Sequence, residues 1–247
     1  SVLLAALVAF RVQARLVPVL VSYAVGALLG AVFLDILPHL FEQTVDYAGT
    51  ASVILAGLLG FFVLEKVLLW RHHHHAGEGD EAPAAHGHGH GHGHDHGRSG
   101  LLIVVGDSFH NFTDGILIAA AFLADVKLGV VTAAAIVAHE VPQEVGDFLV
   151  LLHSGYSRAR ALAMNAVSSL ANVAGALLGY FALSVAQAWV PTVLALAAAS
   201  MLYVAVADLI PGLHRRSSAR ESLVQVTFIG LGIASLWAVH AVLGHAH

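Results

Sequence analysis

The stretch VVTAAAIVAHEVPQEVGDFLVLL, residues 130–152, sets a polar segment between two apolar runs. Apolar runs of this kind are typical of helices that cross a lipid bilayer. The polar segment begins with His139 and Glu140, but it carries Gln143 where zinc proteases of the HExxH type have their second histidine. The stretch therefore allows three interpretations: an altered protease motif, a core helix with unusual polar residues, or a metal site of another kind.

Composition indicates a membrane protein. The chain has 247 residues, of which 58% are hydrophobic and only 11% are charged, and its mean hydropathy is +0.80. In soluble domains about a quarter of the residues are charged. Because a backbone in lipid must satisfy its own hydrogen bonds, we predict an all-α polytopic membrane protein. The chain has no cysteine, which excludes disulfides and thiolate metal ligands.

Polar breaks between apolar runs predict eight membrane helices. The first, at residues 1–10, is too short to span a bilayer, and we interpret it as the second half of a helix rather than a signal-peptide remnant. The organisation is then three helices within residues 1–70, a loop at 71–100, and five helices within 101–247. The seven complete helices are expected near residues 16–41, 50–70, 101–124, 128–153, 158–186, 189–213 and 222–243.

The basic residues predict the orientation. When every second loop is placed in the cytosol, ten of the eleven Lys and Arg fall there, and only Lys127 falls on the other side. This bias is the positive-inside rule. It places both termini outside the cytosol and the loop at 71–100 within it, in what we expect to be the plasma (inner) membrane. The ten cytosolic positions are Arg11, Arg15, Lys66, Arg71, Arg98, Arg158, Arg160, Arg215, Arg216 and Arg220.

The predicted loop reads RHHHHAGEGDEAPAAHGHGHGHGHDHGRSG and holds ten histidines. It has too few apolar residues to bury a core, so we expect it to be disordered. Neutral imidazole binds zinc, nickel and copper. Many interchangeable ligands without fixed geometry are typical of a weak, fast-exchanging metal buffer or sensor. The alternative is a passive solvated linker.

Two neighbouring helices carry polar stripes at mid-membrane depth, where ionisable residues usually mark a function. Residues of the segment GDSFHNFTDG are spaced i, i+3, i+4 and i+7, which is one helix face. Histidines, carboxylates and amides together suit a borderline ion such as Zn²⁺, and also Fe²⁺ or Mn²⁺. Simple hydrogen bonding between helices is the alternative. The stripes comprise Asp107, His110, Asn111 and Asp114, and His139, Glu140, Gln143, Glu144 and Asp147.

Other polar residues suggest a path to this region. An ion could enter past Asp35 and leave past Asp208 toward the histidine loop. Within the second predicted stripe, Pro142 removes a backbone donor and frees the carbonyl of Ala138, so we expect a broken or bent helix there. The candidate pathway residues are Asp35, His39, Asp107, Asp147, Asn172, Asp208 and His214.

A protease is disfavoured because Gln143 is a poor zinc ligand and Pro142 disturbs the helix that would hold a histidine pair. The segments HNFTDG and HEVPQEVGDF, in this order, resemble the ZIP (Zrt/Irt-like) metal transporters, in particular the subgroup whose fifth helix carries HEXPHEXGD. The resemblance extends to the LPH of the second helix, the segment LLHSGYSRARALAMNAVSSLANVAGALLG and the histidine-rich loop, and it covers nearly the whole chain.

The resemblance implies an eight-helix carrier that moves Zn²⁺, and in some members Fe²⁺, Mn²⁺ or Cd²⁺, toward the cytosol, with no prosthetic group and no enzymatic activity. It implies divalent ions and the lipid bilayer as partners, allows a homodimer, and gives no role to nucleic acid. It also implies a transport site, often binuclear, between the fourth and fifth helices. The metal ligands carried over are His110, Asn111, Asp114, His139, Glu140, Gln143 and Glu144.

Two departures from the family bear on the number of metals. Gln143 stands where the subgroup often has histidine and other members have a carboxylate, and Asn172 stands where some members have glutamate. Both departures remove charge or basicity from a second metal position. We therefore expect one well-formed site and a second that is weak or absent.

Three rival functions remain to be tested. An exporter of the cation diffusion facilitator type would have about six helices and a soluble metal-binding domain that this sequence lacks. An intramembrane protease would cleave substrates in a chelator-sensitive way. A sensor would bind zinc without any flux.

Overall fold

The computed structural model of the protein describes residues 16–74, 98–214 and 218–244, and all regular structure in these ranges is helical. The predicted half helix at residues 1–10 and most of the histidine loop lie outside the described residues. The elements are α2 (Val17–Ala31), η1 (Val32–Ile36), α3 (Leu37–Gln43), α4 (Tyr47–His74), α5 (Arg98–Ala124), α6 (Val126–His153), α7 (Arg158–Val185), η2 (Gln187–Trp189), α8 (Val190–Tyr203), η3 (Val204–Leu209), α9 (Ile210–His214) and α10 (Ala219–Gly244).

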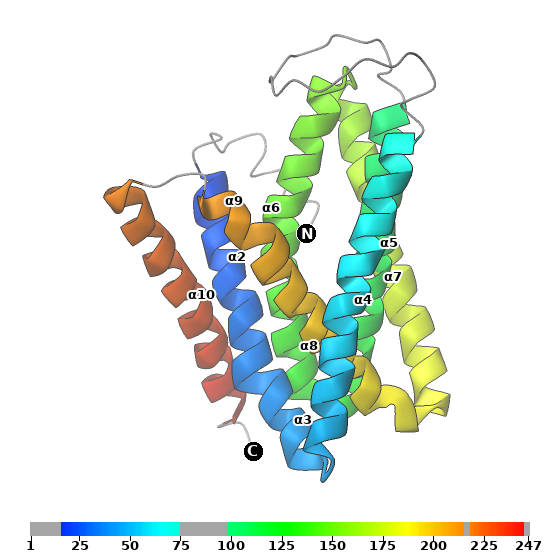
Figure 1. Cartoon of the computed structure of the whole chain (residues 1–247), viewed down its shortest axis with the longest axis vertical. Helices are drawn as coiled ribbons and strands as arrows, with labels where there is room; N and C mark the ends of the chain where they lie inside the picture. The colour runs from blue at the N-terminus through cyan, green and yellow to red at the C-terminus, as the bar shows by residue number, and fades with distance from the viewer. Residues whose placement is uncertain (1–15, 75–97, 215–217, 245–247) are drawn as a thin grey trace.

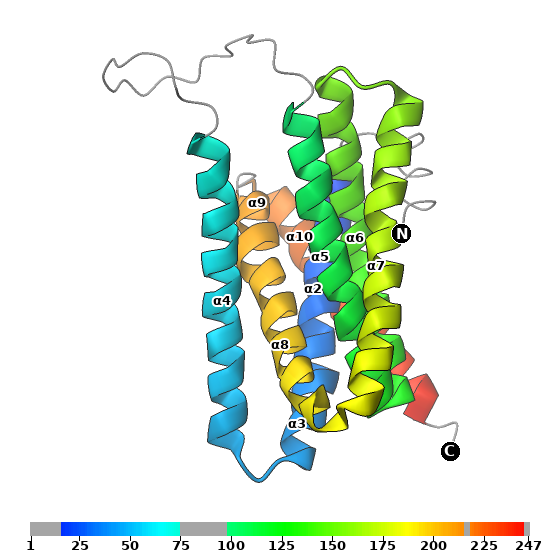
Figure 2. The ribbon, with the colours of Figure 1, turned by 90° about the vertical axis from the view of Figure 1, so that its right-hand side faces the viewer.

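The seven complete helices predicted from the sequence are confirmed, with shifts of a few residues at their ends. Two of them are composite: α2, η1 and α3 follow one another as one segment, and so do α8, η3 and α9. Figures 1 and 2 show the helices running alternately up and down, with α4 along one edge beside α8, and α10 along another beside α2.

The two ends of the bundle differ in charge. One end gathers the start of α2, the end of α4 and the turn between α6 and α7, and it carries Arg158, Arg160 and Arg220 (Figures 1 and 2). The other end gathers α3 and the turn between α5 and α6, where Lys127 lies. These basic side chains follow the predicted loop bias, and the membrane side that each end faces stays a prediction.

Within the described residues, five segments are long and apolar enough to cross a membrane by length and composition: Val17–Gln43, Tyr47–Val67, Arg158–Val185, Gln187–His214 and Ala219–Val242. Large side chains such as Leu59 and Phe62 on α4 and Leu231 and Trp237 on α10 are exposed. Water would penalise so much exposed apolar surface, whereas lipid does not. The chain is thus an all-α polytopic membrane protein. The helices α5 and α6, of 27 and 28 residues, are as long as these segments but are not among the five. They carry the acidic stripes.

Both composite segments contain a π-helical turn that the sequence did not predict. The turn η1 ends just before Pro38, and η3 ends just before Pro211. Because proline lacks an N–H, the carbonyl four residues earlier loses its α-helical partner, and a local π turn accommodates the fault. Each turn contains one acidic residue, Asp35 or Asp208. By contrast, α6 continues without interruption through Pro142, so the helix is not broken there, and a bend at this position stays a prediction.

Glycines bring two helix pairs into close contact. On α5 and α7, a Cβ added at Gly115 would lie 2.0 Å from the carbonyl oxygen of Asn172, and one at Gly175 would lie 2.0 Å from that of Phe112. On α2 and α10, a Cβ at Gly26 would meet the carbonyl oxygen of Ile229 at 2.0 Å. Only glycine permits such an approach of two backbones. These glycines thereby let α5 pack directly against α7.

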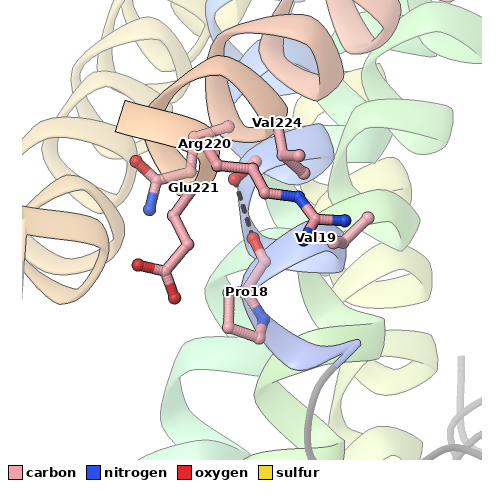
Figure 3. A pocket seen from close by; sticks show the side chains of 7 residues that line it. Pro18, Val19, Arg220, Glu221 and Val224 are labelled. Carbon is pink, nitrogen blue, oxygen red and sulfur yellow. Dashed lines mark hydrogen bonds between the residues drawn. The ribbon is translucent and has the colours of Figure 1, made fainter. Parts of the chain in front are cut away.

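A cavity of about 470 Å³ opens between the beginnings of α2 and α10 (Figure 3). Pro18 and Val19 line it from α2, and Arg220, Glu221 and Val224 line it from α10. Ser22 also lines the cavity, and its hydroxyl donates a hydrogen bond to the carbonyl of Pro18 at 2.7 Å. None of the candidate metal ligands lines this space, so the site lies elsewhere.

Candidate metal site

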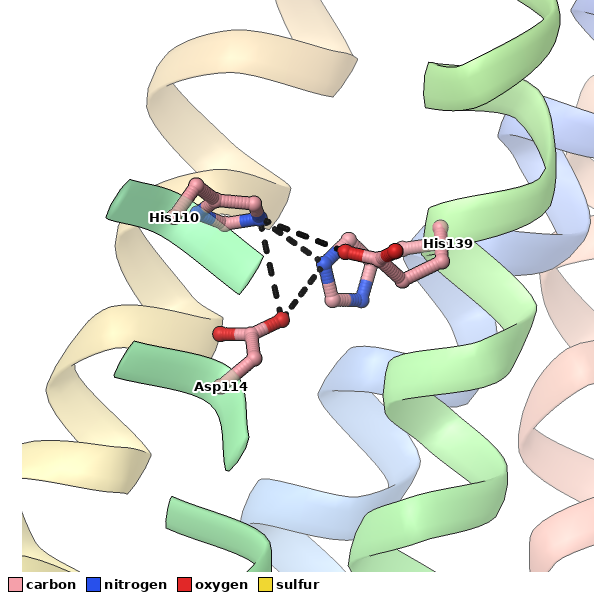
Figure 4. Close-up of side chains that lie close together, drawn as sticks. His110, Asp114 and His139 are labelled. Atoms are coloured by element: carbon pink, nitrogen blue, oxygen red, sulfur yellow. Dashed lines mark hydrogen bonds and ion pairs between the residues drawn. The ribbon is translucent and has the colours of Figure 1, made fainter. Parts of the chain in front are cut away.

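Four side chains from α5 and α6 meet in the middle of the bundle. In Figure 4, His110 and Asp114 on α5 point toward His139 on α6. The Nε2 atoms of the two histidines are 3.2 Å apart, and Asp114 Oδ2 lies 3.2 Å from His139 Nε2 and 3.7 Å from His110 Nε2. Glu140 Oε1 lies 3.9 Å from His110 Nε2. One ligand atom from each of the four residues falls within 4.8 Å of all the others.

Helical spacing creates this cluster. His110 and Asp114 are four apart on α5, so they share a face and their side chains meet. His139 and Glu140 are adjacent on α6: His139 contacts Asp114 on α5, and Glu140 faces His110. The start of α6 is fixed by Asp125, whose side chain accepts a hydrogen bond from the Leu128 N–H at 3.0 Å.

The four residues are shielded from solvent to different degrees. Asp114, His139 and Glu140 are each 2% exposed, whereas the His110 side chain is 23% exposed and lies at the rim. The atoms Asp114 Oδ2 and Glu140 Oε1 are buried and accept no hydrogen bond of regular geometry; they face imidazole nitrogens instead. Buried carboxylates are costly without a donor or a cation. Imidazole nitrogen and carboxylate oxygen are ligands that zinc prefers, so a divalent cation fits this set.

The two amides predicted as ligands lie outside this group of four. Asn111 donates from Nδ2 to the Asp107 side chain at 3.1 Å, and Gln143 donates from Nε2 to the same carboxylate oxygen at 3.4 Å. Asn111 is fully buried, and its Oδ1 accepts no hydrogen bond within the described residues. Asp107, Asn111 and Gln143 thus form a second polar layer one turn away from the four-residue cluster.

Glu144 is buried on the side of α6 that faces α7. Its carboxylate accepts a short hydrogen bond from the Ser169 hydroxyl, and its backbone carbonyl accepts one from Asn165 Nδ2 at 2.8 Å. The structure therefore separates Glu144 from the four clustered side chains and ties it to α7. Asp147 and Asn172 also lie outside the cluster, and Asn172 packs its backbone carbonyl against Gly115.

A cavity of about 300 Å³ adjoins the cluster on the side of α4 and α8. His110, Gln143 and Asp208 all line it. The cavity therefore connects Asp208 with the His110 side of the cluster. Glu65 and Tyr203 also line it, and the Tyr203 hydroxyl donates a short hydrogen bond to the Glu65 carboxylate. Neither residue was predicted from the sequence, although Glu65 is an acid within an apolar span and so carried a usable signal.

At the other end of the bundle, Asp35 and His39 line a separate cavity of about 270 Å³. The Asp35 carboxylate contacts His240 Nδ1 on α10, a partner 205 residues away that sequence spacing could not reveal. His39 Nε2 accepts a hydrogen bond from Gln43 Nε2 at 2.9 Å. His214, the last predicted pathway residue, is exposed at the end of α9 and lines neither cavity.

Comparison with known proteins identifies the family. The family model described as ZIP zinc transporter matches residues 70–240 of the chain, which include all four clustered side chains. The chain belongs to the ZIP zinc transporter family. The predicted family is therefore confirmed. Members of this family are transporters and not enzymes. Membership of the subgroup with the HEXPHEXGD motif stays a prediction.

Relatives differ in how much of them the chain covers. It is 39% identical to zinc transporter ZIP4 of Mus musculus over 143 residues, which are 56% of the chain and 21% of that protein. It is 30% identical to zinc transporter ZIP13 of Pongo abelii over 234 residues, 87% of the chain and 64% of that protein. It is also 30% identical to the ZIP13 homolog of Drosophila melanogaster over 281 residues, 94% of the chain and 79% of the relative. The chain thus spans about a fifth of the length of ZIP4.

Proposed function

We propose that this protein carries Zn²⁺ across the membrane through the cluster of His110, Asp114, His139 and Glu140. The observation that carries the proposal is the convergence of two imidazole nitrogens and two carboxylate oxygens within 4.8 Å in a buried position. With neutral imidazoles the cluster bears two negative charges, which a divalent cation balances. Names of the relatives, zinc transporters ZIP4 and ZIP13, agree with zinc as the cargo.

The surroundings of the cluster favour passage over permanent binding. The cavity of about 300 Å³ beside His110 gives an ion a way out, and Asp208 supplies an acidic residue along it. Conduction requires binding that is strong enough to capture an ion and weak enough to release it. We infer movement from the end with Asp35 toward the end with Arg158, which the positive-inside rule assigns to the cytosol. One ion is bound at a time in the four-residue cluster.

Metal uptake into proteoliposomes tests this function. We expect saturable ⁶⁵Zn²⁺ uptake that excess unlabelled Zn²⁺ and Cd²⁺ suppress, with weaker competition by Fe²⁺ and Mn²⁺ because their preference for nitrogen ligands is lower. Measuring uptake with and without a pH gradient shows whether protons are coupled. Zinc binding without any flux would favour a sensor, and flux only out of the cytosolic side would favour an exporter.

Gln143 offers a test of the number of bound metals. We expect Gln143→His to add a nitrogen ligand beside Asp107 and so to create a second metal position next to the first. Anomalous scattering from crystals grown with Zn²⁺ should show one peak between α5 and α6 in the original protein and two in the variant. Gln225→His on α10 is the matched control, and it should leave a single peak between α5 and α6. Two peaks in the original protein would contradict the single-ion proposal.

A further inference from the structure

A chain of three side chains crosses the end of the bundle that is remote from the four-residue cluster. Lys127, at the start of α6, places its Nζ 3.1 Å from Nε2 of His240 on α10. The other ring nitrogen of His240, Nδ1, contacts Oδ1 of Asp35 in the π turn η1. Three elements far apart in the sequence therefore meet through one imidazole.

The chemistry of the lysine fixes the state of this imidazole. An ammonium group has only donors to offer, so Nε2 of His240 must accept through its lone pair. The ring proton then resides on Nδ1, which donates to the Asp35 carboxylate. His240 is thus a neutral imidazole, oriented by a carboxylate, whose Nε2 lone pair points at a cation.

This arrangement has the form that proteins use to hold a metal. Histidine ligands of zinc commonly donate their second ring N–H to a carboxylate, which fixes the tautomer and raises the basicity of the coordinating nitrogen. Here Asp35 stands in the carboxylate position, and the Lys127 ammonium occupies the place of the metal.

The cavity around this imidazole can complete a coordination shell. It has a volume of about 270 Å³ and is also lined by His39, Glu42 and Asp125. The Asp35 side chain is only 3% exposed, and its second oxygen, Oδ2, is buried without a hydrogen-bond partner in the described residues. The His240 side chain is 41% exposed, so an ion can reach it from the cavity.

We propose that this cavity is a second, peripheral site for a divalent cation such as Zn²⁺, with His240 Nε2 as the central ligand and Asp35 as the group that orients it. The Lys127 ammonium acts as a built-in competitor that an arriving ion displaces. The site is separate from the cluster between α5 and α6, and it stands whether or not that cluster transports zinc.

Protection of His240 from chemical modification tests the proposal. Diethyl pyrocarbonate modifies neutral imidazole nitrogens, and tandem mass spectrometry locates the modified histidines in the full chain held in lipid nanodiscs. Increasing Zn²⁺ should protect His240, and Lys127→Met should lower the half-protecting Zn²⁺ concentration about tenfold, the effect of losing one charge-assisted competitor. Asp35→Asn should raise that concentration about tenfold, as loss of an outer-shell carboxylate does.

Two controls make the outcome specific. Lys66→Met removes the other lysine of the chain, which lies in the second half of α4, far from the turn that joins α3 to α4. It should leave the protection of His240 unchanged. Glu140→Gln impairs the proposed transport site and should also leave it unchanged, so that failure at one site is distinguished from failure at the other. The proposal is overturned if Zn²⁺ never protects His240, or if Lys127→Met and Lys66→Met give the same half-protecting concentration.

Discussion

Replacing His139 by alanine is expected to reduce ⁶⁵Zn²⁺ uptake in proteoliposomes by at least about 100-fold, because loss of a mere outer-shell partner already costs about 10–100-fold in metal affinity. His139 is 2% exposed, and its Nε2 is 3.2 Å from both His110 Nε2 and Asp114 Oδ2. No neighbouring side chain can replace a nitrogen ligand at the centre of the cluster. The matched control is His153→Ala on the same helix, where an exposed imidazole hydrogen-bonds the carbonyl of Leu149, and uptake should stay near that of the original protein.

Glu140→Gln should also reduce zinc uptake by at least about 100-fold. Unlike most substitutions of buried residues, it should raise the stability of the metal-free protein. The buried Oε1 of Glu140 accepts no hydrogen bond, so its charge is a cost in the metal-free protein. Removing that charge with little change in shape should raise the melting temperature of the metal-free protein by about 2–4 °C, the shift that ~1 kcal/mol produces at this chain length. A variant that lost both uptake and stability would show that Glu140 holds the fold together, and uptake at the original rate would remove it from the site.

The sequence predicted the helices of this protein better than their internal geometry. Apolar runs and polar breaks located each long helix in the described part of the chain, since lipid leaves the backbone almost no other choice. The π turns before Pro38 and Pro211 escaped prediction, whereas at Pro142, where a broken or bent helix was expected, α6 is not broken. Proline removes the same hydrogen bond in all three cases, and tertiary packing decides how each helix adjusts.

The polar stripes located the candidate site but not the role of each residue in it. His110 and Asn111 are neighbours in the sequence, yet one helical step of about 100° separates them. That step sends the imidazole toward His139 and the amide toward Asp107. Glu144 shares a face with Glu140, but it lies one turn further along α6 and meets Ser169 on α7. The two predicted stripes therefore divide into the four-residue cluster, a polar layer around Asp107, and a contact between Glu144 and α7.

Long-range partners lay beyond what one sequence can show. The charge count singled out Lys127 as the lone basic residue on its side of the membrane, but nothing in its neighbourhood pointed to His240, 113 residues away. The pairing depends on α10 packing against α2, which glycines such as Gly26 and Gly232 allow.

The contact between α5 and α7 should be the most sensitive packing feature of the fold. A methyl group at Gly115 or Gly175 would lie 2.0 Å from a backbone carbonyl oxygen of the other helix, where no rotamer change can relieve the clash. Overpacking of this kind costs about 1–3 kcal/mol or more. We expect Gly115→Ala and Gly175→Ala each to lower the melting temperature in detergent by about 3–10 °C, given about 2–4 °C per kcal/mol for this chain length.

Gly146 on α6 and Gly230 on α10 are the matched controls, because a methyl group added there meets no atom within 4 Å. At these positions alanine should leave the melting temperature unchanged or raise it, since alanine favours a helix over glycine by up to about 1 kcal/mol. Equal effects at all four positions would mean that helix propensity, and not the approach of α5 to α7, determines stability. Because α5 also carries His110 and Asp114, a separation of α5 from α7 that relieves the clash should shift both ligands relative to His139 and Glu140 on α6. Gly115→Ala should therefore lower zinc uptake even at temperatures where the protein stays folded, whereas Gly146→Ala should not.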